Sequence, residues 1–173
     1  MQTVPVFYRR EGACPPQHGI QTPCKPEFVV ESWRRHRLPI DVRSFEPLTA
    51  AQIAIAHDRA FVDGVLSCDL PNGFGTTDPA VAAALPYTNG GFLAAAREAL
   101  ANGLVACSPT SGFHHAEWAE AQGFCTFNGL MITARTLLQG DQSATPVGGH
   151  QETDPFDPAA RRLAATALAS RRR

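Results

Sequence analysis

Two adjacent histidines, His114 and His115, are the residues of this sequence best suited to chemistry. They lie in a glycine-containing stretch, where both imidazoles can face one cavity, whereas in a regular strand they would point to opposite sides. Two neutral imidazoles near physiological pH can divide the work of amide hydrolysis. One withdraws a proton from water, and the other stabilises charge or returns a proton to the leaving amine. The pair alone is also compatible with two solvated loop residues.

The residues around the pair favour a catalytic pair over two solvated loop histidines. Pro109 and Gly112 precede it, and the run HHAEW is followed closely by GFCTFN. In order and spacing, residues 111–128 resemble the active-site strip of the zinc-dependent histone deacetylase and acetylpolyamine amidohydrolase family. A weaker resemblance extends over residues 4–138.

The resemblance implies a role for each matching residue. His114 looks like the histidine that hydrogen-bonds a metal-bound water and polarises the site, and His115 looks like the general base and acid. Gly123 and Phe124 look like the wall of a narrow channel that holds the stem of an acylated lysine or acetylpolyamine substrate. A flat aromatic wall suits such a stem, because a methylene chain gains by leaving water. Asp78 resembles a rim aspartate that grips the substrate backbone.

Other residues offer competing chemistry. Cys125 lies close to the two histidines and is a candidate nucleophile of a Cys-His hydrolase, against its interpretation as a small buried hydrophobic residue. Cys14, His18 and Cys24 could bind a structural metal, but their spacing matches no standard zinc knuckle and a fourth ligand is missing. The dipeptide at 57–58 is expected to serve helix packing or capping.

The zinc ligands of the family are not found in this sequence. A zinc hydrolase needs about three protein ligands and an open position for water. The family takes them from an Asp-x-His and a later Asp, yet no aspartate here has a histidine two places on. Its oxyanion-stabilising tyrosine comes from far downstream, whereas Tyr8 and Tyr87 both precede the histidine pair. We therefore expect zinc in complete family members, none bound by this chain, and little activity from this chain alone.

Strand and helix patterns alternate along the first half of the chain. Residues 3–8 predict a buried strand, and Pro26 fits the first position of a helix. Residues 38–47 predict a second strand. Residues 49–52 fit a capping box ahead of one helix that reaches Phe61.

The alternation continues around the histidine pair. A helix over 92–103 is expected to end at an Asn-Gly cap, a compact buried strand follows at 104–107, and a helix resumes over 129–138. The pair thus lies just past the carboxyl end of a strand, where open α/β sheets place their ligand sites. The alternation supports an α/β fold. The resemblance implies a three-layer, arginase/deacetylase-like parallel sheet with helices on both faces, here truncated.

The composition changes near Leu138. Residues 1–138 are expected to form the N-terminal part of a deacetylase-like domain, and residues 139–173 a divergent tail that is disordered or loosely helical. The tail has no Ile and cannot supply a buried parallel strand. We interpret the change as a frameshift, a premature stop after unrelated coding, or an alternative product. The missing half of the sheet would expose core surface, which predicts self-association.

Composition excludes some partners and compartments. The 173 residues carry fifteen basic and sixteen acidic side chains, so no net field favours nucleic acid or an acidic membrane surface. No apolar run approaches the length of a membrane span. Five irregularly spaced cysteines and the absence of a signal-peptide pattern predict a cytoplasmic protein.

The sequence therefore leaves three interpretations of the function of this protein. The first is a histone deacetylase-family protein that, when complete, hydrolyses acetyl or acyl amides on lysine or polyamine. The second is a metal-free acyl-lysine binding module that keeps the channel of His114, His115, Gly123 and Phe124, or a non-functional truncated product. The third is a metal-independent hydrolase that uses Cys125.

Overall fold

The computed structural model describes residues 3–110 and 112–142. The chain divides into two compact units, Met1–Asp141 and Gln142–Arg173, and the description below concerns the first. The predicted tail lies outside the described residues from 143 onward. The preceding helix, α5 (Gly129–Gln142), begins where it was predicted and continues beyond Leu138.

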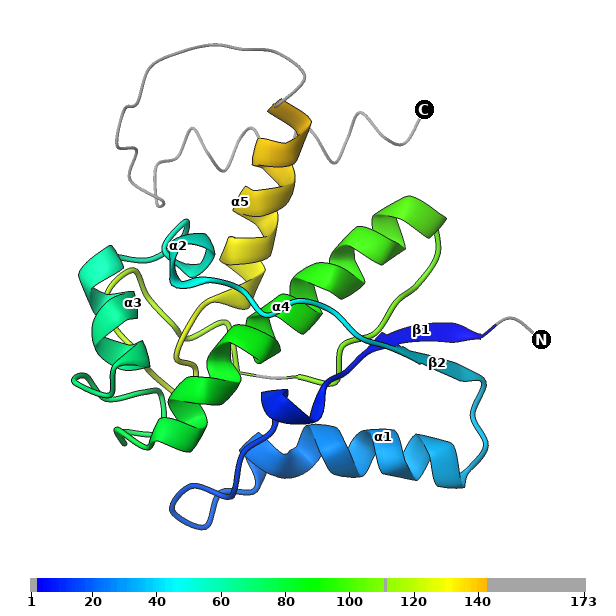
Figure 1. The fold of residues 1–173 in the computed structure, drawn as a ribbon, viewed down its shortest axis with the longest axis horizontal. Coiled ribbons are helices and arrows are strands. Elements are labelled where there is room, and N and C mark those ends of the chain that lie inside the picture. The colour runs from blue at the N-terminus through cyan, green and yellow to red at the C-terminus, as the bar shows by residue number, and fades with distance from the viewer. Residues whose placement is uncertain (1–2, 111, 143–173) are drawn as a thin grey trace. The chain divides into compact units, whose positions relative to one another are not determined.

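A short parallel strand pair forms the sheet. β1 (Val4–Phe7) pairs with β2 (Ile40–Arg43), with Val6 opposite Val42. On its other edge, Val6 forms a parallel bridge with Cys107, so β1 is flanked on both sides. Figure 1 shows α1 and α4 on opposite sides of the strand pair. The described residues are therefore mixed α/β with a small parallel two-stranded sheet.

The third predicted strand is largely wrong. Of residues 104–107, Cys107 alone joins the sheet, donating to the carbonyl of Pro5 at 2.8 Å. Leu104 and Val105 are 56% and 63% exposed. They follow Gly103, which ends the preceding helix in a left-handed conformation, and the chain has not yet reached β1 at that point.

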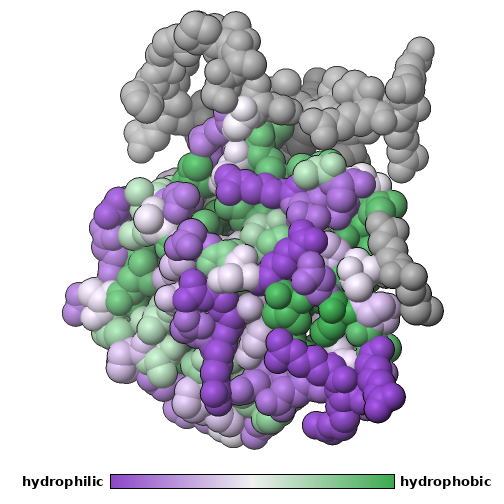
Figure 2. Space-filling view, turned by 45° about the vertical axis from the view of Figure 1, so that its right-hand side comes forward, coloured by the Kyte–Doolittle hydropathy of each residue, from purple (hydrophilic) through white to green (hydrophobic). Residues whose placement is uncertain are grey.

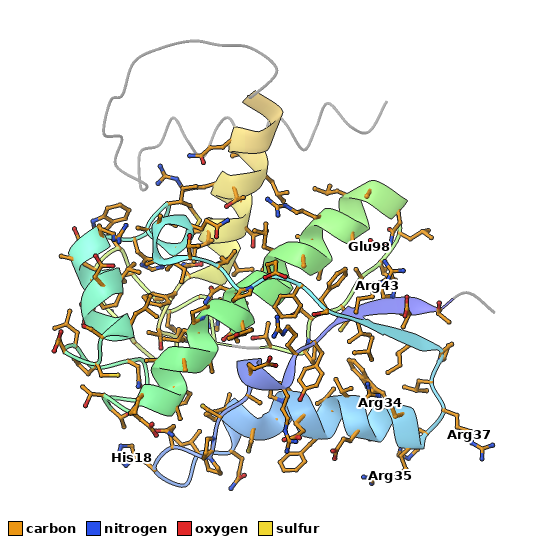
Figure 3. The ribbon with its side chains drawn as sticks, viewed as in Figure 1. His18, Arg34, Arg35, Arg37, Arg43 and Glu98 are labelled. Atoms are coloured by element: carbon orange, nitrogen blue, oxygen red, sulfur yellow. The ribbon has the colours of Figure 1, made fainter. Side chains whose placement is uncertain are left out.

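The helix predicted at Pro26 is confirmed as α1 (Lys25–Arg35), which buries Val30. It ends in a Schellman arrangement, in which the amide of Leu38 donates to the carbonyl of Trp33 and Arg37 has a positive φ of 55°. Glycine is the usual residue at that position, because it carries no Cβ. The exposed side chains at this helix end are labelled in Figure 3: Arg34, Arg35 and Arg37.

The helix predicted to run from the capping box to Phe61 is two helices. Thr49 and Gln52 form the expected reciprocal capping box, but α2 (Ala50–Ile53) lasts a single turn. Asp58 then accepts a hydrogen bond from the amide of Phe61 at 2.9 Å and caps a new helix, α3 (Arg59–Leu66). A second strong N-cap a few residues after the first therefore interrupts the helix.

The helix before the histidine pair is α4 (Pro79–Asn102), which is much longer than predicted at its N-terminal end. Asp78 caps it and Pro86 is accommodated inside it. The predicted C-cap at Gly103 is confirmed, with φ of 66°. Gly90 allows close packing, since a Cβ there would lie 2.7 Å from the carbonyl oxygen of Glu46.

The core lies among α2, α3, α4 and α5. It includes Phe127, which belongs to residues 111–128, called the motif strip below. The ion pair between Arg43 and Glu98, at 3.0 Å, joins β2 to α4 (Figure 3). On the face drawn in Figure 2, hydrophobic side chains are interspersed with hydrophilic ones. In the part of the chain that the structure describes, no helix has the length and hydropathy needed to cross a membrane. Two 3-10 turns, η1 (Arg10–Gly12) and η2 (Thr22–Cys24), complete the described elements.

Candidate functional site

The two histidines predicted to act together lie side by side. The ring centroids of His114 and His115 are 4.0 Å apart, with the ring planes inclined at 43°. Both side chains are exposed, and within residues 3–110 and 112–142 neither has a hydrogen-bond partner. Their nitrogens are therefore available to a water molecule or a substrate.

A glycine without room for a side chain supports one of the rings. A Cβ atom on Gly123 would lie 2.9 Å from the Cγ and Cδ2 atoms of His115. Gly123 also has a positive φ of 53°, so a larger residue would be strained as well as crowded. The His115 imidazole thus lies in the space that a side chain at position 123 would fill.

The predicted channel-wall aromatic is held in an unusual backbone conformation. Phe124 has a φ of 65° and follows Gly123 in a tight turn closed by two hydrogen bonds between Gln122 and Cys125, at 2.7 and 3.0 Å. A positive φ is uncommon for a bulky residue and costs free energy. The ring is nevertheless 51% exposed, so core packing does not explain why an aromatic residue occupies this position.

A second aromatic ring extends this wall. Phe74 packs against Phe124, with ring centroids 5.8 Å apart and an interplanar angle of 31°. Its loop is fixed to the strip by two hydrogen bonds, from the amide of Phe124 to the carbonyl of Gly73 at 3.1 Å and from the amide of Gly73 to the hydroxyl of Thr126 at 2.9 Å. A Cβ on Gly73 would lie 2.6 Å from the carbonyl carbon of Cys125.

His57 lies outside the strip and joins two residues within it, Trp118 and Asn128. The ring is 1% exposed, its Nε2 atom accepts a hydrogen bond from the amide of Asn128 at 2.8 Å, and its Nδ1 atom lies 3.1 Å from the carbonyl oxygen of Trp118. Because Nε2 accepts, Nδ1 carries the proton and the imidazole is neutral. Burial lowers the pKa of His57, which preserves this neutral form.

Asp58 and Asn128 add further hydrogen bonds around the contacts of His57. The amide of Asp58 also donates to the carbonyl of Trp118, at 2.9 Å. Asn128 donates from its side chain to the carbonyl of Ala116 and accepts from the amide of Met131, which caps α5. The helix-packing and capping roles expected at positions 57–58 are confirmed. The same two residues also hold the segment that follows the histidine pair.

The structure places Asp78 at the start of α4. One carboxylate oxygen accepts from the amide of Ala80 and the other from the side chain of Gln17, both at 2.8 Å. The hydrogen bond from Gln17, followed by that from Ala80, lowers the pKa of Asp78. The carboxylate is therefore ionised at neutral pH and is already used in capping and loop attachment.

The cysteines offer little nucleophilic chemistry in this arrangement. Cys125 is 1% exposed and its thiol lies 3.5 Å from the carbonyl oxygen of Gly123. Burial, followed by the charge of Asp78, raises the pKa of Cys14 to about 11. A thiol with that pKa is almost entirely protonated at neutral pH.

Zinc does not fit the described side chains. Over residues 3–110 and 112–142, no group of three or more His, Cys, Asp or Glu residues is arranged to hold a metal ion. Cys14, His18 and Cys24 likewise form no such group.

The fold and the site define a parallel α/β protein that presents an imidazole pair beside an aromatic wall. A model of the histone deacetylase domain matches residues 21–145, and the chain belongs to the histone deacetylase family. Its fold is similar to the crystal structure of the HDA15 HD domain, with a TM-score of 0.63 at 15% sequence identity. The match covers 81% of this chain and 44% of that one, so the chain spans less than half of that solved domain. A search of curated proteins finds no matching relative.

Two contributors to the site were not predicted. Phe74 lies in a loop rich in Gly, Pro and Asn, and the glycine that precedes it, Gly73, is a signal of close backbone approach. For His57 the sequence predicted only helix packing or capping. Nothing in the sequence could show that its two ring nitrogens would reach residues 61 and 71 positions away, because such contacts depend on the tertiary fold.

Proposed function

We propose that this chain recognises acylated amines, such as acetyl-lysine or acetylpolyamine, with His114 and His115 at the amide and Phe124 along the stem. Membership of the histone deacetylase family supports this assignment. The observation that carries it is the imidazole pair, in contact at 4.0 Å and packed on Gly123 beside an exposed aromatic wall. An amide carbonyl accepts hydrogen bonds and a methylene stem prefers an apolar surface, so both ends of the ligand are matched.

The chemistry open to the pair is proton transfer. In hydrolysis of an acyl amide, water adds to the carbonyl carbon, the C–N bond of the tetrahedral intermediate breaks, and the amine leaves with a proton. In such a reaction, His115 would remove the proton from water and deliver it to the amine. His114, the neighbouring ring, would hydrogen-bond the water. His57 would act as a positioning residue, because it reaches neither histidine but holds the segment 118–128, which carries Gly123 and Phe124.

In complete family members, zinc supplies the charge that activates water and stabilises the intermediate, and the full three-layer sheet carries its ligands. The described residues do not fit that role, so we assign to this chain recognition rather than turnover. A second candidate, zinc-dependent hydrolysis, needs ligands from outside residues 3–110 and 112–142.

The test compares binding of an acetyl-lysine peptide with binding of the same peptide unmodified, using the full chain. We expect tighter binding of the acetylated form, and roughly tenfold weaker binding after His114→Ala or His115→Ala, as for one lost hydrogen bond. The His18→Asn variant changes an exposed histidine elsewhere and should bind normally. Equal affinity for both peptides would exclude recognition. Stoichiometric zinc together with release of acetate would support hydrolysis instead.

A further inference from the structure

Two cysteines lie at the base of a short hairpin. The hairpin is formed by Gln17 and Ile20, whose backbone groups exchange hydrogen bonds at 3.1 and 2.7 Å. At its base, the amide of Cys14 donates to the carbonyl of Pro23 at 3.3 Å, and Cys24 is the next residue. Within residues 3–110 and 112–142 the two cysteines belong to no metal-binding group, which leaves the chemistry of two neighbouring thiols.

The backbone places these two cysteines at the separation that a disulfide bridge requires. The Cα atom of Cys14 is one bond from the donor nitrogen, and the Cα atom of Cys24 lies about 2.8 Å from the acceptor oxygen across a trans peptide. With the hydrogen bond at 3.3 Å, the two Cα atoms are at most about 7 Å apart. Disulfides span Cα separations of roughly 4.4–6.8 Å, so a bridge here needs little or no backbone movement.

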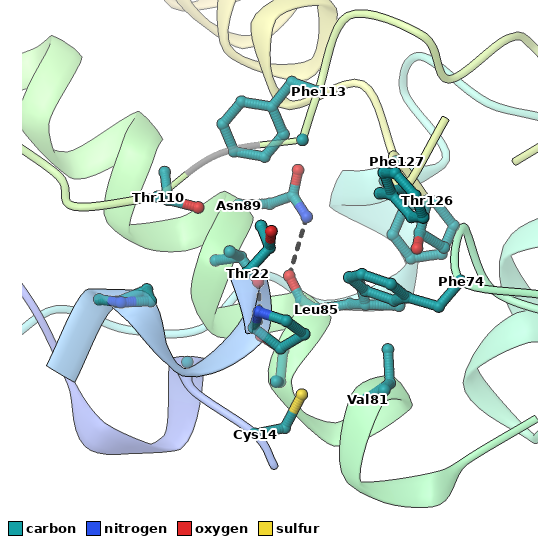
Figure 4. A pocket seen from close by; sticks show the side chains of 17 residues that line it. Cys14, Thr22, Phe74, Val81, Leu85, Asn89, Thr110, Phe113, Thr126 and Phe127 are labelled. Atoms are coloured by element: carbon teal, nitrogen blue, oxygen red, sulfur yellow. Dashed lines mark hydrogen bonds between the residues drawn. The ribbon is translucent and has the colours of Figure 1, made fainter. Parts of the chain in front are cut away.

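Both thiols are free, and each is half-buried rather than enclosed. The Cys24 thiol donates to the carbonyl of Gln21 at 3.0 Å, a contact at the protein surface. Figure 4 shows the Cys14 thiol, which faces a cavity that Thr22 also lines. Burial, followed by the charges of Asp78 and Cys24, raises the pKa of Cys14 to about 11. The influence of Cys24 on this pKa agrees with neighbouring sulfur atoms.

We propose that Cys14 and Cys24 are a redox pair, which forms a reversible disulfide by exchange with a small disulfide such as glutathione disulfide. The thiolate of Cys24, at the surface, attacks one sulfur of glutathione disulfide and releases one glutathione. The thiolate of Cys14 then attacks the Cys24 sulfur of the mixed disulfide and releases the second. The two protein sulfurs lose two electrons to glutathione disulfide, and their two protons leave with the two glutathione molecules. In a reducing compartment such a bond is transient, as in redox sensors.

The bridge would close a loop that is attached to other parts of the site. Gln17, inside this loop, is 6% exposed, and its side chain donates to Asp78 at 2.8 Å and accepts from the hydroxyl of Thr76 at 3.3 Å. Asn72 donates to the same hydroxyl and accepts from the amide of Phe74, both at 2.9 Å. A bridge at the base of the hairpin would therefore stabilise the loop that carries the second aromatic ring of the wall.

The first experiment measures how strongly the fold favours the bridge. The full chain is equilibrated with reduced and oxidised glutathione at about pH 8, once folded and once unfolded in concentrated urea. We expect the equilibrium constant for bridge formation to be at least about tenfold larger in the folded chain, because the fold holds the two cysteines together. An equal or smaller constant in the folded chain would overturn the proposal.

A single tryptic peptide reports the bridge. Trypsin should release residues 11–34 in one piece, because Lys25 is followed by proline, and this peptide contains Cys14, Cys24 and no other cysteine. After treatment with iodoacetamide, the bridged peptide carries no label and is two hydrogen atoms lighter than the reduced, unlabelled peptide. Dithiothreitol should restore two thiols that can be alkylated. Two alkylatable thiols before reduction would mean that no bridge forms.

Single variants test the order of attack and the specificity. In Cys14→Ser the reaction should stop at the mixed disulfide, so that peptide 11–34 carries one glutathione on Cys24. The matched control Cys68→Ser removes another half-buried cysteine and should leave bridge formation unchanged. A wild-type chain that stops at the mixed disulfide, or that links Cys24 to Cys68, would contradict the proposal.

Stability provides an independent readout that uses no acylated ligand. By thermodynamic linkage, a fold that favours the bridge tenfold is itself favoured tenfold by the bridge. The equilibrium constant for unfolding in urea should therefore be at least about tenfold lower for the oxidised chain than for the reduced chain. In Cys14→Ser, oxidised and reduced glutathione should give the same constant within about twofold. Equal stability of the oxidised and reduced wild-type chains would overturn the proposal.

Discussion

The Nε2 atom of His57 accepts a hydrogen bond from the backbone amide of Asn128 at 2.8 Å, across 71 residues of sequence. The other nitrogen of the same ring lies 3.1 Å from the carbonyl oxygen of Trp118, so one buried side chain joins the two ends of the segment 118–128, which follows the histidine pair and carries Gly123 and Phe124. The ring contacts Phe61 and Phe127, with centroids 6.0 and 5.4 Å away. Its removal should therefore affect both stability and ligand binding.

Replacing His57 by alanine should lower the free energy of unfolding by about 3 kcal/mol or more. The change leaves the Asn128 amide without a partner, at roughly 1–3 kcal/mol, removes one of the two hydrogen bonds to the Trp118 carbonyl, and opens a cavity in the core. Urea denaturation followed by circular dichroism measures it. His18→Asn serves as the control, because His18 is exposed and asparagine tolerates its positive φ of 48°. A loss below about 1 kcal/mol would refute the bridging role.

The same ring should make stability depend on pH. Because burial lowers the pKa of folded His57 below its ordinary value of 6.5, the unfolded chain takes up the proton first as the pH falls. The contribution of His57 is complete above about pH 6.5 and is lost as the pH falls toward the lowered pKa. Urea midpoints between pH 8 and pH 5 should decrease in that window. His57→Gln keeps a donor and an acceptor without titrating, so it should flatten the curve, and an identical slope in the variant would exclude His57 as the source.

Gly123→Ala should weaken acyl-peptide binding at least tenfold, because its Cβ would displace the His115 ring. It should also cost about 1 kcal/mol of stability through backbone strain. Gly19→Ala separates the two effects, since Gly19 has a similar positive φ of 78° but open space around it. The control should lose stability and keep its affinity. If both variants bind equally well, contact with Gly123 does not position His115.

Phe124→Asn should separate stability from binding. Asparagine tolerates a positive φ, so relief of strain offsets the lost ring contact with Phe74, and the unfolding free energy should change by less than about 1 kcal/mol. Affinity for the acylated peptide should nevertheless fall at least tenfold. Phe28→Asn, at another exposed phenylalanine, should not alter binding. Unchanged affinity in Phe124→Asn would remove this residue from the channel wall.

Alkylation rates should disfavour the reading of Cys125 as a nucleophile. This thiol is 1% exposed, whereas Cys24 is partly exposed. With iodoacetamide at pH 7.5, peptide mass spectrometry should find Cys24 modified well before Cys125. Cys14, with its pKa of about 11, should also react slowly. Rapid selective labelling of Cys125 would restore the cysteine-hydrolase reading.

Local signals predicted much of the fold, and long-range contacts account for what was missed. The capping box at Thr49 and the C-cap at Gly103 depend on neighbouring residues, and both are confirmed. Helix α4 begins well before the predicted residue 92; it accommodates Pro86, whose carbonyl accepts from the amide of Leu48 at 3.1 Å. The exposure of Val105 depends on where the sheet begins, which local sequence does not specify.

For the candidate site too, local sequence predicted some features, and long-range contacts account for the others. The motif strip identified His114 and His115 through residue order, and the structure brings their rings together. It could not indicate that Asp78 would be engaged by Gln17, 61 residues earlier, or that Phe74 would pack on Phe124. These relationships arise only when loops from separate parts of the chain pack against one another.

The bridge between Val6 and Cys107 has a consequence for synthesis of the protein. The two residues are about a hundred positions apart, and at roughly 5–20 residues per second the ribosome needs about 5–20 seconds to pass from one to the other. During that interval β1 has β2 on one side and an open backbone on the other. Nascent chains on neighbouring ribosomes would then compete with Cys107 for the same hydrogen-bonding edge.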